Sequence, residues 1–396
     1  MASTAPALAA DPLATARSLA EDFAAGSAER DRERRFPLDE IAQLKNSGLL
    51  GLRLPVELGG AAVDTTTIVN VTGELAVGDP NIAQMFLIHT YGEELITALP
   101  DSDVKRRLAS RVLGGEFVTN AFNEVGTKTI MEFRTVVARN GEGAYRINGK
   151  KFYATGSLAG DLMYVVAVTD DDEPQLTICW VDTDAPGVVI HDDWRGIGQR
   201  TTASGTIELD DVAVADDDVT PVDHLMTPES LFGNFGQVSF SAIFIGMAKG
   251  ALRDGFEFVR TRARARPESG VESAREDPYV LLRAGELESK LAAAEGALVL
   301  ALDARAAAEA AATAEARNAA SIAAGHAKVT TGRAALDISE GIFQICGASA
   351  TLEKYGLDRH WRNARTLTLH DPMDYKLRFA GDFVLNDTAP PISPYT

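Results

Sequence analysis

The fold is decided by the stretch Tyr164-Val165-Val166-Ala167-Val168-Thr169-Asp170-Asp171-Asp172-Glu173-Pro174-Gln175-Leu176-Thr177-Ile178-Cys179-Trp180-Val181. Its two ends are short runs of β-branched, apolar and aromatic residues, which favour strands. The acidic segment between them ends in a proline and is typical of a turn. The stretch therefore predicts two strands of a compact antiparallel barrel or sandwich.

Similar short runs extend from this stretch in both directions, over residues 116 to 222. Turn residues such as Asn140-Gly141 and Asn148-Gly149 separate them. The further strands predicted in this way are 117–121, 135–138, 145–147 and 205–209.

Helical patterns precede this β region. Apolar residues at helical spacing begin near Phe36, and two more apolar helices are predicted over residues 68–77 and 82–99. The turn-rich segment from Leu54 to Gly60 separates the first helix from the next.

Helical patterns also follow the β region, after Pro228. An alanine-rich span from Leu287 to Ala327 lets helices approach closely, as in a bundle or an oligomer core. A solvated, weakly packed helix is the alternative. Leu298, Leu300 and Leu302 in the middle of the span favour burial. The sequence thus predicts an α+β protein with a helical domain at residues 1–115, a β domain at 116–225 and a helical domain at 226–396.

Charge and composition exclude several classes of partner. The chain of 396 residues has a formal net charge of −19, which argues against nucleic acid or an anionic membrane as its main partner. No apolar run reaches the length of a membrane span, and the N-terminus lacks the features of a signal peptide. Two cysteines without a histidine pattern offer neither a disulfide framework nor a metal site, so a cytoplasmic location is expected. No glycine-rich dinucleotide fingerprint or P-loop occurs either.

A candidate catalytic turn lies near the C-terminus, at His370-Asp371-Pro372. The proline ends the preceding helical pattern, so the imidazole and the carboxylate are expected on a constrained turn. A histidine held there is a candidate acid, base or hydrogen-bond donor. A capping histidine and a turn-forming aspartate are the alternative interpretation.

Four further motifs occur in a recognisable order. They are Leu54-Pro55-x-Glu57-x-Gly59-Gly60, then Asn148-Gly149-Lys150-Lys151-Phe152-Tyr153-Ala154-Thr155-Gly156, then the strand 205–214, then Phe343-Gln344-Ile345-Cys346-Gly347 followed by Arg362-Asn363-Ala364. Each is weak alone, but the ordered set makes the chain, from about Phe36 to Thr396, resemble the acyl-CoA dehydrogenase superfamily. The resemblance implies an N-terminal helical domain, a central β-barrel and a C-terminal four-helix bundle.

The turn at His370 departs from the dehydrogenases of this superfamily. Their proton-abstracting glutamate lies in a Glu-Gly-Thr turn, and Asp371-Pro372 stands at the corresponding place. The shorter carboxylate and the rigid proline make α-proton abstraction by Asp371 doubtful. The turn, together with the ending Asn386-Asp387-x-Ala389-Pro390-Pro391, instead resembles the reduced-flavin-dependent monooxygenases on this fold, of the dibenzothiophene and sulfone monooxygenase type.

The resemblance also implies the cofactor. The segment that helps to hold the adenine half of FAD in the dehydrogenases is altered here to Gly347-Ala348-Ser349-Ala350-Thr351, and their flavin-side loop is altered at Asn123 to Ile130. FMN is therefore expected. Tyr153 and Thr155, on the motif that lies along the flavin in the family, are expected to contact the ring.

Further site residues are expected by the same resemblance. His370 would lie over the flavin and donate to the activated oxygen. His89 and Tyr91 would face the substrate cavity, although a histidine on an apolar helix is as often a core residue. Asn120 would be an amide donor in the cavity and a flavin contact.

Gly347 is also expected to contact the cofactor, and its phosphate would be held by one arginine of the cluster Arg260 to Arg266. Arg264 is the preferred arginine, reaching the phosphate across a subunit interface. Most arginines of such a cluster are normally solvated.

The implied function is that of a two-component FMNH2-dependent monooxygenase. It would take reduced FMN from a separate NAD(P)H:flavin reductase, form a flavin hydroperoxide with O2, and oxygenate a heteroatom of a small organic substrate, sulfur first and amine nitrogen second. A homotetramer is expected. The alternatives are an FAD-dependent acyl-CoA dehydrogenase that uses Asp371 as its base, and a flavin-free binding protein on the same fold.

Overall fold

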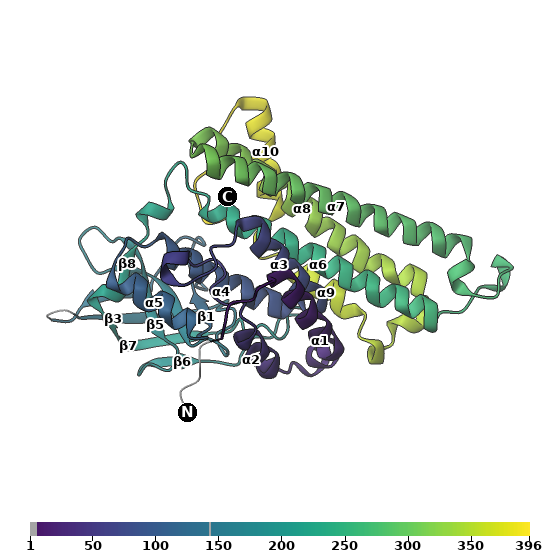
Figure 1. The fold of residues 1–396 in the computed structure, drawn as a ribbon, viewed down its shortest axis with the longest axis horizontal. Coiled ribbons are helices and arrows are strands. Elements are labelled where there is room, and N and C mark those ends of the chain that lie inside the picture. Colours follow the sequence, from purple (N-terminus) through teal and green to yellow (C-terminus); the bar gives the residue numbers. More distant parts are fainter. Residues whose placement is uncertain (1–5, 142–143) are drawn as a thin grey trace.

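The computed structural model describes residues 6–141 and 144–396, and its fold is α+β as predicted. A curled sheet lies at one end, five N-terminal helices pack beside it, and long C-terminal helices extend away from both (Figure 1). The helices are α1 (Pro12–Glu33), α2 (Leu38–Asn46), α3 (Thr65–Gly78), α4 (Pro80–Ala98), α5 (Asp103–Leu113), α6 (Phe232–Thr261), α7 (Pro278–Ala311), α8 (Ala314–Cys346), α9 (Asp358–Leu367) and α10 (Met373–Asn386). The strands are β1 (Val118–Ala121), β2 (Val136–Arg139), β3 (Ala144–Lys151), β4 (Leu162–Thr169), β5 (Leu176–Asp182), β6 (Val188–Ile190), β7 (Ile207–Ala215) and β8 (Val219–Pro221).

Side-chain caps begin several of the N-terminal helices. Asp11 accepts a hydrogen bond from the Ala14 N–H at the start of α1, and Asp79 accepts one from the Asn81 N–H at the start of α4. Each cap is followed by a proline at the first helical position, where no N–H is needed. The helices α1 and α5 had no counterpart among the predicted elements.

A buried arginine joins the first helix to the others. Arg30 on α1 donates to Asp79 Oδ2 at 2.8 Å and to Glu40 Oε1 at 2.6 Å, and also to the Phe23 carbonyl. The side chains of Arg30 and Asp79 are both only 2% exposed. Such a desolvated pair holds its partners in one geometry, because either charge alone would be costly to bury.

The eight strands form one sheet in the order β6-β7-β3-β2-β4-β5-β8, with β1 paired to β4. The two strands of the deciding stretch, β4 and β5, are antiparallel neighbours in register from Leu162↔Asp182 to Val168↔Leu176. The expectation of a wholly antiparallel sheet is wrong, because β1 and β2 both run parallel to β4. Neither strand is joined to β4 by a hairpin, because parallel neighbours need a longer connection.

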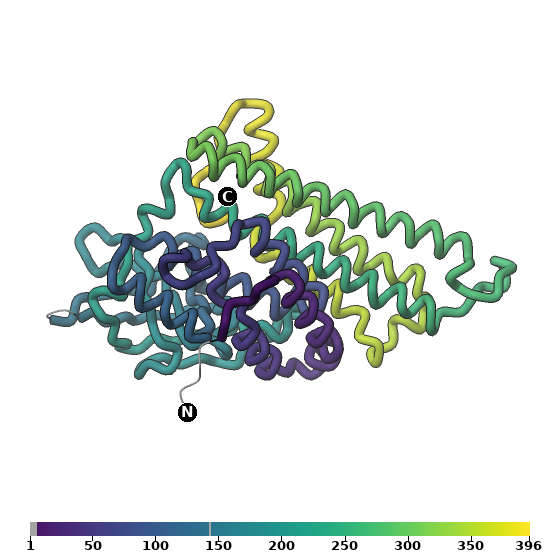
Figure 2. The backbone as a smooth tube through the Cα atoms, in the orientation of Figure 1, coloured from purple at the N-terminus to yellow at the C-terminus, as the bar shows by residue number. Residues whose placement is uncertain are grey.

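The C-terminal helices α6, α7 and α8 run side by side, and the chain reverses between α7 and α8 at Ala312 and Thr313 (Figure 2). Leu298 and Leu302 of α7 are buried, as expected. Leu300 is 69% exposed, so its predicted burial within the chain is wrong. Positions 298 and 302 lie on one helical face, and position 300 lies on the opposite face.

The helix α6 is long and apolar enough to span a bilayer by length and composition alone. However, 94% of its most apolar window is buried inside the protein. Its apolar character is therefore explained by its place in the core.

We expect Arg30→Met to lower the free energy of unfolding by about 3–5 kcal/mol, because it leaves the Asp79 carboxylate buried without its partner. Arg17→Met is the matched control, since Arg17 also joins α1 to a neighbouring helix through Glu74 but is 61% exposed. Urea titration of both variants tests this prediction. Equal losses in the two variants would contradict it.

Candidate active site

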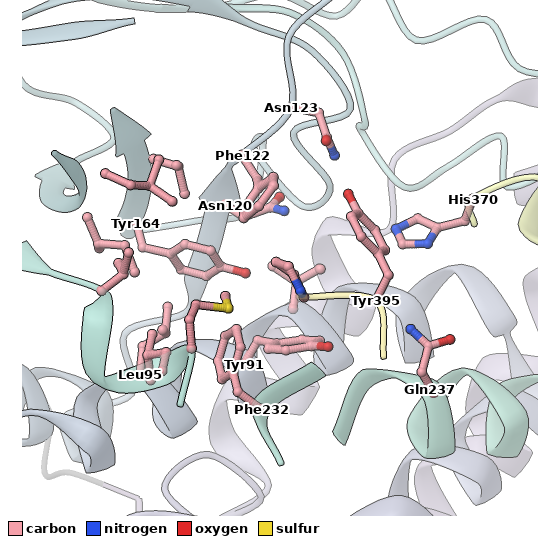
Figure 3. Close-up of a pocket in the computed structure, with 18 of the residues that line it drawn as sticks. Tyr91, Leu95, Asn120, Phe122, Asn123, Tyr164, Phe232, Gln237, His370 and Tyr395 are labelled. Atoms are coloured by element: carbon pink, nitrogen blue, oxygen red, sulfur yellow. The ribbon is translucent and has the colours of Figure 1, made fainter. Parts of the chain in front are cut away.

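The main cavity lies where α4, the sheet, the N-terminal half of α6 and the C-terminal tail meet (Figure 3). Its volume is about 850 Å³, including its open mouth. This is within the range of small-molecule sites in proteins. The walls are mainly apolar and aromatic, and the polar lining residues are Tyr91, Asn120, Asn123, Tyr164, Gln237, His370 and Tyr395.

One face of α4 supplies a wall of the cavity. Ile88, Tyr91 and Leu95 line it at helical spacing. The Tyr91 ring packs edge-on against Phe232, with ring centroids 5.4 Å apart. Gly236 of α6 leaves the space that the Tyr91 hydroxyl occupies, since a Cβ there would overlap that oxygen. The structure thus places Tyr91 on the cavity, as expected from its helix.

Two buried amide side chains, those of Asn120 and Gln237, line this region. Asn120, at the end of β1, is 8% exposed, and Gln237 of α6 is 2% exposed. Within the described residues, no donor reaches Asn120 Oδ1 or Gln237 Oε1. Both residues line the cavity, but these two oxygens have almost no accessible surface there.

His370 lies on the turn between α9 and α10 and faces the cavity (Figure 3). Its ring is 4.5 Å from that of Phe240 and 6.5 Å from that of Tyr395, measured between centroids. Surrounding protein and the Lys328 ammonium lower the pKa of His370 to about 4. The ring is also exposed to solvent through the cavity, and water there offsets part of the lowering. His370 is neutral at neutral pH in either case.

Asp371, the next residue, faces away from this cavity. Its carboxylate is buried and accepts from Lys328 Nζ at 2.9 Å and from Lys376 Nζ at 2.7 Å. Burial raises the pKa of Asp371, but the two ammonium groups outweigh burial and lower it. A carboxylate held by two lysines is a weak base, and it does not line the cavity. The structure therefore argues against the dehydrogenase alternative.

His89 is not at the cavity, so its expected place facing the substrate is wrong. It is fully buried in the core, where the Val118 N–H donates to its Nδ1 at 3.0 Å and its ring stacks on Phe117. Its Nε2 lies 3.0 Å from Glu93 Oε1, although the angle is poor for a hydrogen bond. Glu93 also accepts from the backbone of Gly51, so the pair anchors a loop.

Thr155 and Tyr153 lie on the segment that follows β3. The Thr155 hydroxyl is buried and pairs with Ser204 Oγ at 2.9 Å. Tyr153 is 50% exposed, has a φ of +58°, and packs edge-on against Trp194. Neither residue lines the main cavity, so their predicted contacts with a flavin remain predictions.

Arg264 and Gly347 lie at the other end of the molecule. Arg264 follows the C-terminus of α6, about 35 Å along the helix from Gln237 at a rise of 1.5 Å per residue. Gly347 ends α8 with a φ of +76°. Within one chain, neither residue lines the cavity, so their expected roles at the cofactor remain predictions.

The sequence analysis missed several residues of the site. Tyr164 lies on β4 and looks in the sequence like an ordinary strand residue, and Tyr395 lies nine residues beyond the end of α10. Lys151 was quoted only as part of a motif, yet it pairs with Glu124 at 2.7 Å and thereby holds the loop that carries Asn123. No spacing signal joins these positions, because they meet only in the folded chain.

We expect His89→Phe to lower stability while leaving the cavity intact, because only core contacts are lost. We expect His370→Ala to leave stability nearly unchanged, because its ring is exposed to the cavity. Two measurements on both variants check this difference: the thermal unfolding temperature, and the affinity for a ligand of the cavity. A stable His89→Phe variant whose cavity no longer binds ligand would reverse the assignment.

We expect Asp371→Asn to destabilise the fold by about 3–5 kcal/mol, because two buried ammonium groups lose their counter-charge. Asp337→Asn, which removes the exposed partner of Lys290, is the control. The lowered pKa of Asp371 means that its contribution is present above the unfolded pKa of about 3.9 and is lost as pH falls through the folded value. The variant should therefore lose less stability on acidification than the wild type. Unfolding curves measured between pH 7 and pH 2 test both points.

Comparisons with known proteins agree with this geometry. The sequence matches the acyl-CoA dehydrogenase N-terminal domain over residues 12–116, the middle domain over 123–212 and the C-terminal domain over 238–375. It is 32% identical to the dibenzothiophene monooxygenase of Rhodococcus qingshengii, over 96% of this chain and 94% of that protein.

Two further relatives are described as using or binding FMN. The chain is 34% identical to a probable FMNH2-dependent monooxygenase, SfnC, of Pseudomonas putida, over 97% of both chains. The crystal structure of TdsC from Paenibacillus sp. A11-2 with FMN and indole superposes with a TM-score of 0.91 at 29% identity, over 97% of this chain and 99% of TdsC.

Proposed function

The chain belongs to the acyl-CoA dehydrogenase family and, within it, to the FMNH2-dependent monooxygenases, and we propose that it oxygenates sulfur in a small, neutral, largely apolar substrate. Amine nitrogen is the second choice of acceptor. The named relatives include enzymes of sulfur compounds, which supports sulfur as the first choice.

The observation that carries this proposal is the composition of the cavity wall. Among the residues that the structure describes, no lysine, arginine, aspartate or glutamate lines it. An ionised substrate would lose its hydration there without gaining a counter-charge, which is costly. Aromatic walls with a few amide and phenol groups suit a flat, neutral molecule.

The residues present fit a flavin beside this cavity. Reduced FMN, when bound, reduces O2 and makes one oxygen atom available for transfer to the substrate. Asn120 and Gln237 line the cavity and carry amide groups, which can donate to or accept from a polar edge of a bound molecule. The hydroxyl of Thr155, which already pairs with Ser204, would position the ring from the sheet side.

His370 is the residue we assign to the reacting oxygen. Its imidazole is neutral, so it can donate from one ring nitrogen and accept at the other. It can therefore hold or pass a proton at that oxygen. The rings of Phe240 and Tyr395 lie beside it and limit the orientations of the imidazole.

Partners follow from the same proposal. A separate NAD(P)H:flavin reductase would supply the reduced cofactor, because no nicotinamide motif occurs in the sequence. Exposed apolar side chains on α7 and α10, including Leu300 and Leu385, support the proposed homotetramer. In that assembly Arg264 and Gly347 of one copy would serve the cofactor of another. We keep the cytoplasm as the proposed location.

We expect the protein to slow the reoxidation of FMN, reduced beforehand without oxygen, when it is mixed rapidly with 18O2 buffer and dibenzothiophene. The product should carry 18O on sulfur. Methanesulfinate and aniline are tested in parallel. Methanesulfinate tests an anionic sulfur acceptor and aniline tests an amine nitrogen acceptor, whereas dibenzothiophene is the neutral sulfur acceptor.

His370→Ala should lower product formation by about 100-fold or more while FMN binding is retained. Reoxidation at the rate of free FMN, with no oxygenated product from any substrate, would overturn the proposed function. Preference for methanesulfinate would overturn the neutral-substrate part alone.

A further inference from the structure

A buried charge cluster lies directly behind His370. It consists of Asp371 with Lys328 of α8 and Lys376 of α10, whose side chains are 8%, 1% and 4% exposed. Both ammonium groups bind the same carboxylate oxygen, Asp371 Oδ2. The cluster therefore holds two positive charges and one negative charge. Burying such a surplus is unfavourable, so the cluster is more than a simple stabilising pair.

Lys376 also contacts a second part of the site. Its ammonium donates to the Tyr395 carbonyl, in the tail that follows α10. It thus joins the turn that carries His370 to the tail that carries Tyr395. These two segments supply the two side chains that face each other in the cavity (Figure 3).

The tail has no regular secondary structure of its own to keep Tyr395 in place. It is held by Arg317, which donates to the carbonyls of Pro390 and Pro391, and by a close approach to Gly233. Arg317 also donates to the carbonyl and the hydroxyl of Thr396, and the Tyr395 N–H donates to Ser393 Oγ. Among the described residues, Lys376 is the side chain that binds both the Tyr395 carbonyl and Asp371, the residue after His370.

Lys328 acts on the other side of the cluster. Its ammonium lies 5.2 Å from the centre of the Phe240 ring, and that ring contacts His370. The charged groups that act on His370 are Lys328, Lys376 and Asp371. The side chains that approach it from α6 and the tail, those of Phe240 and Tyr395, are uncharged. The surplus positive charge thus opposes protonation of His370.

We propose that Lys376 is a positioning residue for oxygen transfer, which fixes His370 and Tyr395 relative to each other by binding Asp371 and the Tyr395 carbonyl together. This rests on the function proposed above. Lys328 shares the effect on charge but not the link to the tail. The two lysines should therefore differ when they are replaced.

The experiment compares Lys376→Met and Lys328→Met, with Lys290→Met as a control that removes an exposed lysine of another lysine–aspartate pair. Either replacement in the cluster leaves one lysine paired with Asp371, so the fold should survive. Three quantities are measured: the pKa of His370 by NMR in flavin-free protein, hydrogen exchange of residues 391–396, and sulfoxide formed per FMNH2 oxidised. The remainder of the FMNH2 is expected to yield hydrogen peroxide.

Both cluster variants should raise the pKa of His370 by about one unit, because each removes a nearby positive charge. Only Lys376→Met should speed exchange in the tail, and only it should lower the sulfoxide yield about tenfold. The control should match the wild type in all three. Lys376→Arg, which keeps the charge, should recover part of the yield.

Equal yields in Lys376→Met and Lys328→Met, or an unchanged tail in Lys376→Met, would overturn the proposal. A wild type that forms no product would refute the proposed function instead. The NMR and exchange measurements need no flavin, so they would still decide whether Lys376 joins the two segments.

Discussion

Burial of α6 is the constraint on which the rest of the structure depends. This helix of 30 residues, about 45 Å long, is apolar on nearly every face and must be covered on all of them. The helices α3 and α8 cover most of its length, α4 and α7 add to this cover, and its first turns face the sheet across the cavity. The cavity lies between these first turns and the strands, with Phe232, Gln237 and Phe240 of α6 among its lining residues.

Electrostatics divides the neighbourhood of this cavity into two zones. The cavity wall is neutral, and the charges lie behind it in the cluster of Asp371, Lys328 and Lys376. Because Asp371 is bound to both lysines, it is unavailable as a base, whereas the neighbouring His370 lines the cavity. The same arrangement keeps the imidazole neutral. The neighbouring residues His370 and Asp371 thus have different roles: His370 lines the cavity, and Asp371 binds the two lysines behind it.

The sequence predicted much of the fold because periodicity reports burial of a face. The strands around Tyr164 and Ile178 and the helices over 68–77 and 82–99 appear where alternation and helical spacing placed them. The same reasoning failed at Leu300, which was grouped with Leu298 and Leu302 by composition rather than by face. It also failed at His89, because a buried histidine and a cavity histidine have the same neighbours in sequence.

What the sequence alone determined is the order of helical and β regions, the family, and the turn that carries His370. Local propensity, periodicity and the order of motifs depend only on the order of residues along the chain. Three features depend on the tertiary structure: Asp371 is ion-paired with two lysines, Tyr395 of the C-terminal tail lines the cavity, and no charged side chain of the described residues lines it. Lys328, Asp371, Lys376 and Tyr395 come from separate segments, and the energy of burying a charge depends on neighbours that only folding brings together.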